Sequence, residues 1–283
     1  MVRFALVSVI AFVTSASGAT IFIPPGPGTP VQDAIDAANP NDTVRLALGA
    51  YPEHVVITKA LKLRGVTHIA QELADTTNFQ GGCTAGPVIT VAADNVQIRD
   101  LAIATDAEGG IEVVGRAKVK LKRLFVASNC AVVTRPAVNV EASTRVVVDN
   151  VWASGFSVPG GPVGIRIADT PIQGGIRLRH VVAGHYAVGV LLENNGILSV
   201  RVTAGDMNFN RRGILLQGTS RAIVAHNELI DNSISGIEID SGSSGNSIVR
   251  NVISGSPTDV IDDGAGNCWR NNTFTTGSVP PCP

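Results

Sequence analysis

A short phrase of glycine and branched apolar residues recurs along the second half of the sequence. Gly213-Ile214-Leu215-Leu216 returns as Gly236-Ile237-Glu238-Ile239, 23 positions later. Aligned on the isoleucine after the glycine, eight residues fall into register at intervals of 22–27 residues: Ile89, Ile111, Val138, Ile165, Val190, Ile214, Ile237 and Val260. A repeat this short cannot bury its own apolar face, so it must stack on its neighbours and the fold is restricted to a solenoid.

Each repeat has the periodicity of β-strands. In five repeats the next apolar residue follows the aligned one two places later, as in Ile165 and Ile167, which is the alternation of a strand with one face inward. A second apolar segment follows in each unit, for example Leu121–Val126, and no unit has an amphipathic helical pattern. Leucine-rich repeats have a similar period but need a helical half, so the sequence predicts an all-β, single-stranded parallel β-helix.

The composition agrees with tightly stacked strands. Aromatic residues make up only 4% of the chain, and Val, Ile, Leu, Ala and Gly supply most of the apolar content. Asn227 and Asn251 occupy equivalent places in successive repeats, where stacked amides can bond one another and the turn backbone. The formal net charge of −1 and the lack of any basic run of five residues give no reason to expect a nucleic-acid partner.

The two ends of the sequence differ from the repeats. Residues 1–19 have the pattern of a secretory signal peptide, with Arg3 before the apolar stretch Phe4–Val13. We therefore expect a secreted or periplasmic protein with no membrane span in the mature chain, and a monomer. Residues 20–283 form one domain in this interpretation, divided into a cap and first coil (20–66), central coils (87–266) and a C-terminal flap (267–283).

A solenoid needs caps because its end strands expose unpaired backbone groups. Thr29 and Pro30 have the residue types of a helix N-cap and first turn, and Asn39-Pro40 ends the helical pattern, which predicts a short N-terminal capping helix. In an oxidising compartment the cysteines predict two disulfides, of which Cys268–Cys282 would fix the last segment. The other two cysteines are Cys83 and Cys130, and no spacing suggests a zinc site.

The N-terminal segment also resembles a known superfamily. Residues 31–38, 42–46, 49–53 and 56–65 are similar to the opening coil of right-handed parallel β-helix proteins of the pectin-lyase-like superfamily. Its members include pectate lyases, pectin methylesterases, alginate epimerases and the copper-site maturation factor of nitrous oxide reductase. The resemblance implies a right-handed coil and an association with carbohydrate. It carries over no catalytic residue, because the motifs of the pectate lyases, methylesterases, polygalacturonases and epimerases are absent from this sequence.

The repeat register itself supplies candidate site residues. The residue one place beyond the second inward position should point outward, and Glu193, Gln217, Asp240 and Asp263 would then stack as a polar strip at about 4.8 Å per coil. The distance between two carboxylates one or two coils apart matches that of the catalytic pairs in glycosidases. Carboxylate oxygens also suit Ca²⁺, the only cofactor we consider. The alternative is a solvated polar face without a site.

Basic and aromatic residues lie beside this strip. Arginine suits carboxylated sugars and a tyrosine ring can stack on a pyranose, so the strand and its preceding turn are candidates for a sugar cleft. The candidate catalytic residues are Glu193, Asp240, Asp263, Arg166 and His185. The candidate substrate-binding residues are Tyr186, Arg211, Arg212 and Gln217.

The sequence thus favours a protein associated with an acidic polysaccharide or a cell-surface glycan. It either acts on the polymer as a lyase, hydrolase or epimerase, or binds it without turnover. A structural β-helix and a periplasmic accessory factor resembling the copper-site maturation protein are two further hypotheses. The residues alone leave open whether the chain is an enzyme.

Overall fold

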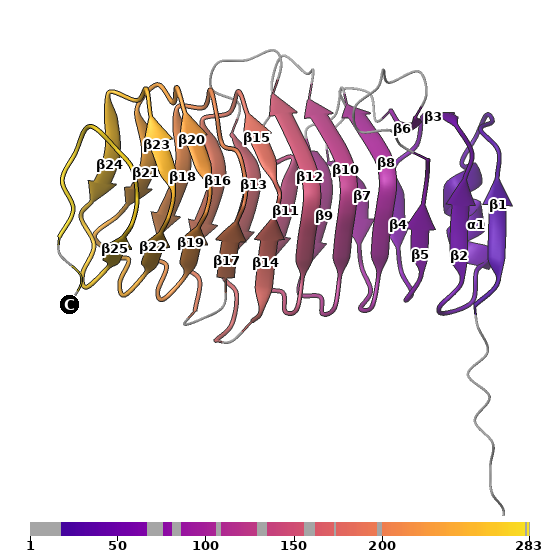
Figure 1. Ribbon diagram of the computed structural model, residues 1–283. Coiled ribbons are helices and arrows are strands. Elements are labelled where there is room, and N and C mark those ends of the chain that lie inside the picture. Colours follow the sequence, from indigo (N-terminus) through magenta and orange to yellow (C-terminus); the bar gives the residue numbers. More distant parts are fainter. Residues whose placement is uncertain are drawn as a thin grey trace, which may run out of the picture.

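A computed structural model describes residues 18–66, 76–80, 86–105, 109–128, 135–155, 162–172, 174–196, 200–280 and 282. Figure 1 shows their strands stacked coil upon coil into one elongated solenoid. The strands of the solenoid pair in parallel, each with the equivalent strand of the next coil. The predicted right-handed, single-stranded parallel β-helix is confirmed. The proposed signal peptide lies outside the described residues, except for its last two positions.

One face of the solenoid is a nine-stranded sheet with one strand from each coil. Its strands, in chain order, are β4 (Val55–Ile57), β7 (Pro87–Val91), β9 (Gly109–Val114), β11 (Val138–Glu141), β13 (Val163–Ala168), β16 (Val188–Glu193), β18 (Arg212–Gln217), β21 (Ser235–Ile239) and β24 (Thr258–Asp262). The eight residues aligned in the sequence lie directly beside one another in this sheet, for example Ile165 beside Val190 and Ile214 beside Ile237. The repeat register is therefore confirmed.

The remaining strands form a fourteen-stranded sheet and a two-stranded one. The larger sheet contains β1 (Thr20–Ile23), β2 (Thr43–Leu46), β3 (Gly49–Tyr51), β5 (Lys62–Arg64), β6 (Thr77–Phe79), β8 (Gln97–Thr105), β10 (Lys120–Ser128), β12 (Val147–Gly155), β14 (Ile176–Arg179), β15 (Val182–Gly184), β17 (Val200–Thr203), β19 (Ile223–Ala225), β22 (Ser247–Val249) and β25 (Cys268–Arg270). The smaller sheet pairs β20 (Glu228–Ile230) with β23 (Val252–Ser254).

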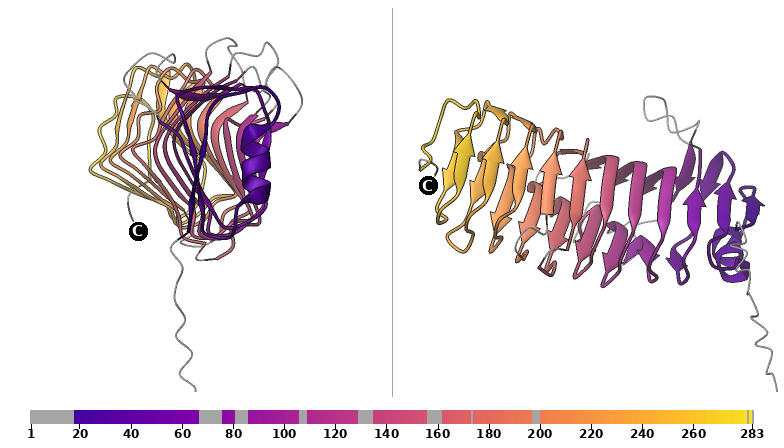
Figure 2. Two further views of the ribbon diagram at one scale, coloured as in Figure 1. Left: turned by 90° about the vertical axis from the view of Figure 1, so that its right-hand side faces the viewer. Right: turned by 60° about the horizontal axis from the view of Figure 1, so that its bottom comes forward.

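The long strands of the larger sheet bend in the middle. Asp100, Arg123 and Asn150 interrupt β8, β10 and β12 with positive φ angles of 60°, 48° and 55°. The left-handed conformation of one residue turns the strand sharply, so that its second half closes the coil. Figure 2 shows the resulting closed cross-section in the view along the solenoid. The residues before each bend consequently form one flat face, separate from the nine-stranded sheet.

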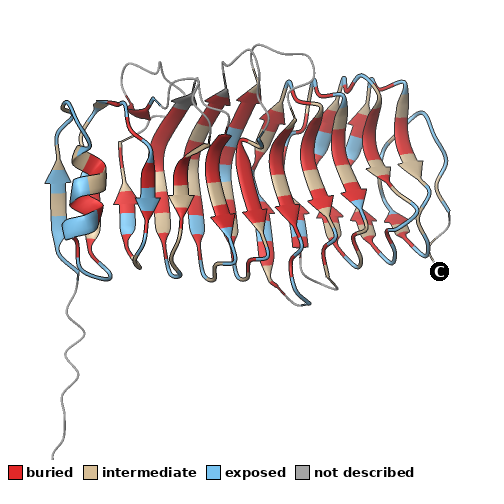
Figure 3. Ribbon diagram, turned by 180° about the vertical axis from the view of Figure 1, so that it is seen from behind, coloured by how far each residue is buried: buried red, intermediate tan, exposed pale blue. Residues whose placement is uncertain are grey.

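Aliphatic side chains from all faces fill the interior. Ile89, Ile111, Ile165 and Ile214 are at most 1% exposed, and Figure 3 shows the buried positions continuing from coil to coil. Each such side chain contributes about 1.5–3 kcal/mol by leaving water.

A polar column accompanies the aliphatic core. Asn227 and Asn251 lie one above the other, and Asn272 extends the column by one coil. The amide nitrogen of Asn227 donates to Oδ1 of Asn251 at 2.9 Å. This confirms the stacked asparagine column expected from the sequence.

The N-terminal cap is the helix α1 (Pro30–Ala37), which contacts β1, β2 and β4. Val31 and Ile35 are fully buried on its inner face. The side chain of Thr29 makes no hydrogen bond to the helix backbone, although its carbonyl accepts from the N–H of Asp33. Instead, the carboxylate of the buried Glu53 accepts from the backbone N–H groups of Val31 and Gln32, both at 3.0 Å. The helix N-terminus is thus satisfied by the following coil rather than by its own N-cap.

Replacing Glu53 by alanine is expected to lower the free energy of unfolding by about 1–2 kcal/mol, because two N–H groups lose a charged acceptor. Thr29→Ala is the matched control and should change it by only a few tenths of a kcal/mol. Urea titration of both variants compares them. Equal losses from the two changes would contradict the assignment of the capping to Glu53 rather than Thr29.

At the other end, the expected flap begins as a further coil. β25 pairs with β22 and places Trp269 in the column of inward side chains. The disulfide Cys268–Cys282 is present, whereas Cys83 and Cys130 lie outside the described residues.

Burial alone would raise the pKa of Asp259, but hydrogen bonds from Thr275, Thr276 and Ser256 hold it below its usual value. This carboxylate fastens the last segment to β24.

Candidate functional site

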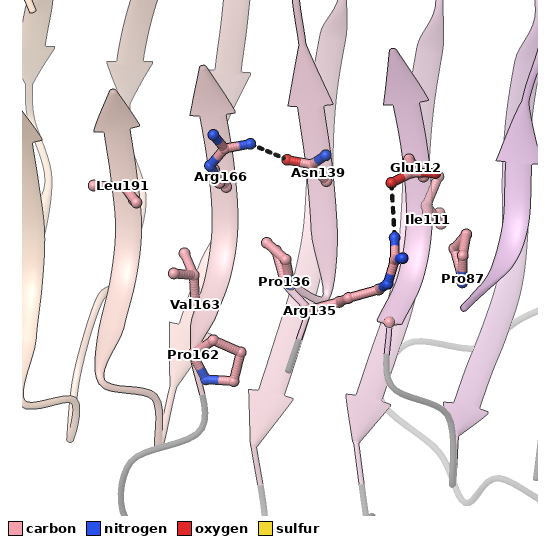
Figure 4. A pocket seen from close by; sticks show the side chains of 11 residues that line it. Pro87, Ile111, Glu112, Arg135, Pro136, Asn139, Pro162, Val163, Arg166 and Leu191 are labelled. Carbon is pink, nitrogen blue, oxygen red and sulfur yellow. Dashed lines mark hydrogen bonds and ion pairs between the residues drawn. The ribbon is translucent and has the colours of Figure 1, made fainter. Parts of the chain in front are cut away.

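A hollow opens on the outer face of the nine-stranded sheet, over β7, β9, β11, β13 and β16. Its volume is about 300 Å³, which is at the lower end of the range for small-ligand sites. Figure 4 shows its side chains as sticks. The lining residues are Pro87, Gly109, Ile111, Glu112, Arg135, Pro136, Asn139, Pro162, Val163, Arg166 and Leu191.

Strand alternation explains why polar side chains face this hollow. Glu112, Asn139 and Arg166 each lie between two inward apolar residues, and they are direct neighbours across β9, β11 and β13. The coil spacing of about 4.8 Å therefore sets the distance between their backbones. Pro136 and Pro162, which precede β11 and β13, add rigid apolar surface.

Arg166 lies at the centre of a hydrogen-bond network. Its Nε and Nη2 atoms lie 2.8 and 2.7 Å from Oε2 of Glu193. Its Nη1 lies 2.6 Å from Oε2 of Glu141 and 3.1 Å from Oδ1 of Asn139. Of the five N–H donors of the guanidinium, three form hydrogen bonds within the protein, and Nη2 is also in ion-pair contact with Glu193. Arg166 consequently fixes the orientation of its neighbours more than it offers donors to a ligand.

The charge of Arg166 is secure. Burial would lower the pKa of its guanidinium, but the hydrogen bonds to Glu141 and Glu193 outweigh this and raise the pKa above its ordinary value. A group that stays protonated cannot accept a proton from a substrate. Arg166 therefore serves as a fixed cation and not as a base.

Arg135 is the more available cation. Its Nη1 lies 3.2 Å from Oε1 of Glu112, its side chain is 47% exposed, and its remaining N–H groups have no partner among the described residues. In Figure 4 the Asn139 oxygen faces Arg166, which leaves the amide nitrogen turned away from it. A guanidinium that keeps unpaired N–H groups, an amide N–H₂ and the Glu112 carboxylate thus surround one hollow.

No protein-family model and no curated protein matches this sequence. Solved structures do match it. AlyGC, a PL6-family alginate lyase, superposes with a TM-score of 0.65 and 13% identity over 91% of this chain and 39% of the lyase. Pectate lyase Pel9A superposes with a TM-score of 0.57 and 12% identity over 89% of this chain and 80% of the lyase. The periplasmic alginate epimerase AlgG superposes with a TM-score of 0.54 and 9% identity over 82% of this chain and 73% of the epimerase.

The chain has the parallel β-helix fold of these proteins. At such low identity the likeness concerns the fold alone. This chain spans about two fifths of the length of AlyGC, so the match does not cover the whole of that lyase.

The polar strip expected on this β-helix is aligned but does not act as one group. Glu193 is the direct neighbour of Gln217, yet its carboxylate bonds Arg166. The Asp240 carboxylate turns into its own loop, where it accepts from the hydroxyl of Ser243 at 2.7 Å, and it also accepts from the backbone N–H of Gly218 in the previous coil at 3.0 Å. Asp263 is exposed. None of these four lines the hollow.

The residues of the preceding turn are also separated. The His185 ring stacks on Phe209, with ring centroids 5.8 Å apart. Arg211 is exposed, and Arg212 is paired with Glu238 at 2.7 Å. Of all the residues predicted for the site, only Arg166 lines the hollow. Glu193 is the one other predicted residue that contacts Arg166 among the described interactions.

Tyr186 cannot play its expected part from where it lies. Its side chain is 3% exposed inside the coil, and burial raises the pKa of its hydroxyl far above the usual value. A ring in the core is inaccessible for stacking on a sugar. Within this turn Tyr186 alone is buried, since the preceding His185 is exposed.

Glu112, Arg135, Asn139 and Glu141 are the residues that sequence reasoning did not select. The sequence did contain a signal for three of them. Glu112 and Asn139 occupy the outward position between the two inward residues of β9 and β11, and Glu141 occupies the next outward position of β11. Among the described residues, no group of three or more His, Cys, Asp and Glu side chains could hold a metal ion. Glu193, one of the oxygen donors considered for Ca²⁺, is instead bound by Arg166.

Proposed function

We propose that this β-helix binds an acidic polysaccharide, with one uronate unit of the polymer seated in the hollow over β9, β11 and β13. The observation that carries the proposal is the convergence of Arg135, Asn139 and Glu112 on that hollow. The three groups supply a cation, an amide donor and a carboxylate acceptor, which is what a sugar carboxylate and its neighbouring hydroxyls require.

Arg135 is the residue that recognises the acid. Its guanidinium presents a planar pair of N–H donors that matches a carboxylate, and its exposure leaves the pair free for a ligand. Asn139 donates to a hydroxyl because Arg166 holds its oxygen in the opposite direction. Pro136 and Pro162 offer apolar surface to the C–H face of the pyranose.

Binding is better supported than turnover. Among the described lining residues Glu112 is the one carboxylate, and it is paired with Arg135. Hydrolysis needs two carboxyl groups flanking the bond, and elimination needs a base. A lyase or epimerase activity is the second candidate, favoured by the names of the proteins that share the fold.

The setting of the proposed activity is outside the cytoplasm. The likeness in fold to a periplasmic epimerase, the disulfide Cys268–Cys282 and the leader-like first residues support a secreted or periplasmic protein. In the described part of the chain, no helix is long and apolar enough to cross a membrane. Mass spectrometry of the exported protein tests the position of cleavage.

Replacing Arg135 by alanine is expected to weaken binding of oligogalacturonate and oligoalginate about tenfold, because a charged hydrogen bond is lost. Calorimetric titration measures the affinity. Arg221→Ala, which removes an exposed arginine from a distant turn, is the control and should leave the affinity unchanged. Equal affinities of the two variants would contradict the proposed site.

The same oligosaccharides decide between binding and turnover. Ultraviolet absorbance detects the unsaturated uronates that a lyase releases, a reducing-end assay detects a hydrolase, and proton NMR detects an epimerase. The proposal expects binding without a change in the polymer. Release of products that Arg135→Ala abolishes would establish the enzyme instead.

A further inference from the structure

Basic side chains gather on a second face, formed by the first halves of the strands of the fourteen-stranded sheet. Outward side chains there form two rows that run along the solenoid axis. The first row contains Lys62, Gln97, Lys120, Val147, Arg177 and Arg201, each paired in register with the next. The second contains Arg45, Arg64, Arg99, Lys122, Asp149, Arg179 and Thr203.

With Arg123 at the bend of β10, these rows hold ten cations, which we call the basic face. Its members are Arg45, Lys62, Arg64, Arg99, Lys120, Lys122, Arg123, Arg177, Arg179 and Arg201. They represent ten of the 22 basic residues in a chain whose net charge is −1. The only carboxylates within the rows and at their bends are Asp100 and Asp149, so the face carries a surplus of eight positive charges.

The two carboxylates leave most of this charge uncompensated. Asp100 contacts Arg64, Arg99 and Arg123, and Asp149 contacts Lys122 and Arg179. Within the described part of the chain, five exposed members form no ion pair: Arg45, Lys62, Lys120, Arg177 and Arg201. Like charges on neighbouring strands repel and lower stability, so their concentration on one face calls for a negatively charged partner.

We propose that the basic face binds a linear acidic polysaccharide lying along the solenoid axis. This surface is distinct from the hollow over β9, β11 and β13. The rows extend over seven strands, from β2 to β17, or roughly 29 Å at the spacing of strands in a sheet. Six of the seven strands supply at least one cation to the rows, the exception being β12 with Val147 and Asp149, and the coil spacing is close to the length of a pyranose unit. A stretched polyuronate therefore presents one carboxylate to each coil.

The chemistry of the face distinguishes a polysaccharide from other polyanions. From β2 to β17 neither row contains an aromatic side chain, although Phe22 of β1, which is 60% exposed, lies beside Arg45 at the end of the second row. Single-stranded nucleic acids are held largely by stacking on several such rings. The rows also lack the large apolar side chains that a protein inserts into an anionic membrane. With eight more cations than carboxylates, the face suits a partner that offers negative charge and hydroxyl groups.

The test reverses three unpaired charges in one variant, Lys120→Glu with Arg177→Glu and Arg201→Glu. The control reverses three exposed arginines that lie neither on the seven strands of the face nor in the hollow, Arg211, Arg221 and Arg250, and so has the same net charge. Labelled oligogalacturonates of increasing length are titrated at about 50 and 200 mM salt. Circular dichroism and thermal unfolding confirm that both proteins are folded.

We expect the face variant to bind long oligomers about tenfold to hundredfold more weakly than the unaltered protein, and to lose much of the salt dependence. The control variant should bind within about twofold of it. Affinity should rise with oligomer length until the chain spans the seven strands. Arg135→Ala, by contrast, should weaken the binding of short oligomers and leave the dependence on length and salt unchanged, so that failure at the hollow and failure at the basic face are separate results.

Two outcomes overturn the inference. Unchanged binding of long oligomers by the face variant would show that the basic face is not the docking surface. Tighter binding of single-stranded DNA of equal charge, or of vesicles rich in anionic lipid, would show that the partner is not a polysaccharide.

Discussion

Replacing Ile214 by aspartate is expected to prevent folding. Ile214 is fully buried in the nine-stranded sheet and lies directly between Val190 and Ile237. A carboxylate at this position would lie between two apolar neighbours with no partner, and removal of the isoleucine adds a packing loss. The cost of about 5 kcal/mol or more is comparable with the whole stability of an ordinary domain.

The neighbouring residue provides the matched control. Leu215 points outward from the same strand, beside Leu191 and Glu238. Leu215→Asp should therefore fold with a loss of about 1 kcal/mol. Soluble yield, far-ultraviolet circular dichroism and urea unfolding compare the two. A folded Ile214→Asp protein, or equal damage from both changes, would contradict the inward and outward assignment.

Replacing Asn251 by alanine is expected to produce the second-largest loss, about 3 kcal/mol or more. The Asn251 amide donates to the backbone carbonyl of Val224 and to Asn272, and it accepts two hydrogen bonds from Asn227. Each polar group left unpaired in the core costs about 1–3 kcal/mol. Alanine removes all four bonds at once, and the shortened side chain leaves a gap that is hard to fill.

Asn272→Ala is the comparison for this column. Asn272 is partly exposed at the end of the column, so water can replace some of its bonds and the loss should be about half as large. Urea unfolding gives both values, and hydrogen exchange at the Asn227 amide reports the column directly. If Asn251→Ala were as stable as the unaltered protein, the column would be incidental to the fold.

The fold could be predicted from the sequence because its determinants are local. A strand with one buried face shows period-two alternation, and stacking of coils requires the same phrase at each turn, as in Ile165 and Val190. The stacked amides of Asn227 and Asn251 were visible for the same reason. Helix capping by Glu53 could not be read locally, because the acceptor follows its donors by more than twenty residues.

The candidate site was harder to predict because side-chain direction depends on the exact outward position. Selecting the residue beyond the second inward position led to Asp240, which turns into its own loop. The outward residue between the inward pair leads to Glu112, Asn139 and Arg166. The basic face was hidden for another reason. Its charges are spread over six strands, with at most three in any one strand, so no run of five consecutive basic residues marks it.

Distances between spin labels on the basic face test the central claim, that equivalent residues of successive repeats lie in one row. Lys62 and Arg201 are five strand pairings apart, through Gln97, Lys120, Val147 and Arg177. Cysteine is introduced at position 62 together with position 120, 177 or 201, and both cysteines carry a spin label. Pulsed electron paramagnetic resonance then measures the distance between the two labels in each pair. Since Cα spacing grows by about 4.8 Å per pairing, the longest pair should lie about 24 Å apart. Distances that do not increase steadily with the number of repeats would contradict the stacked coil and, with it, both proposed binding surfaces.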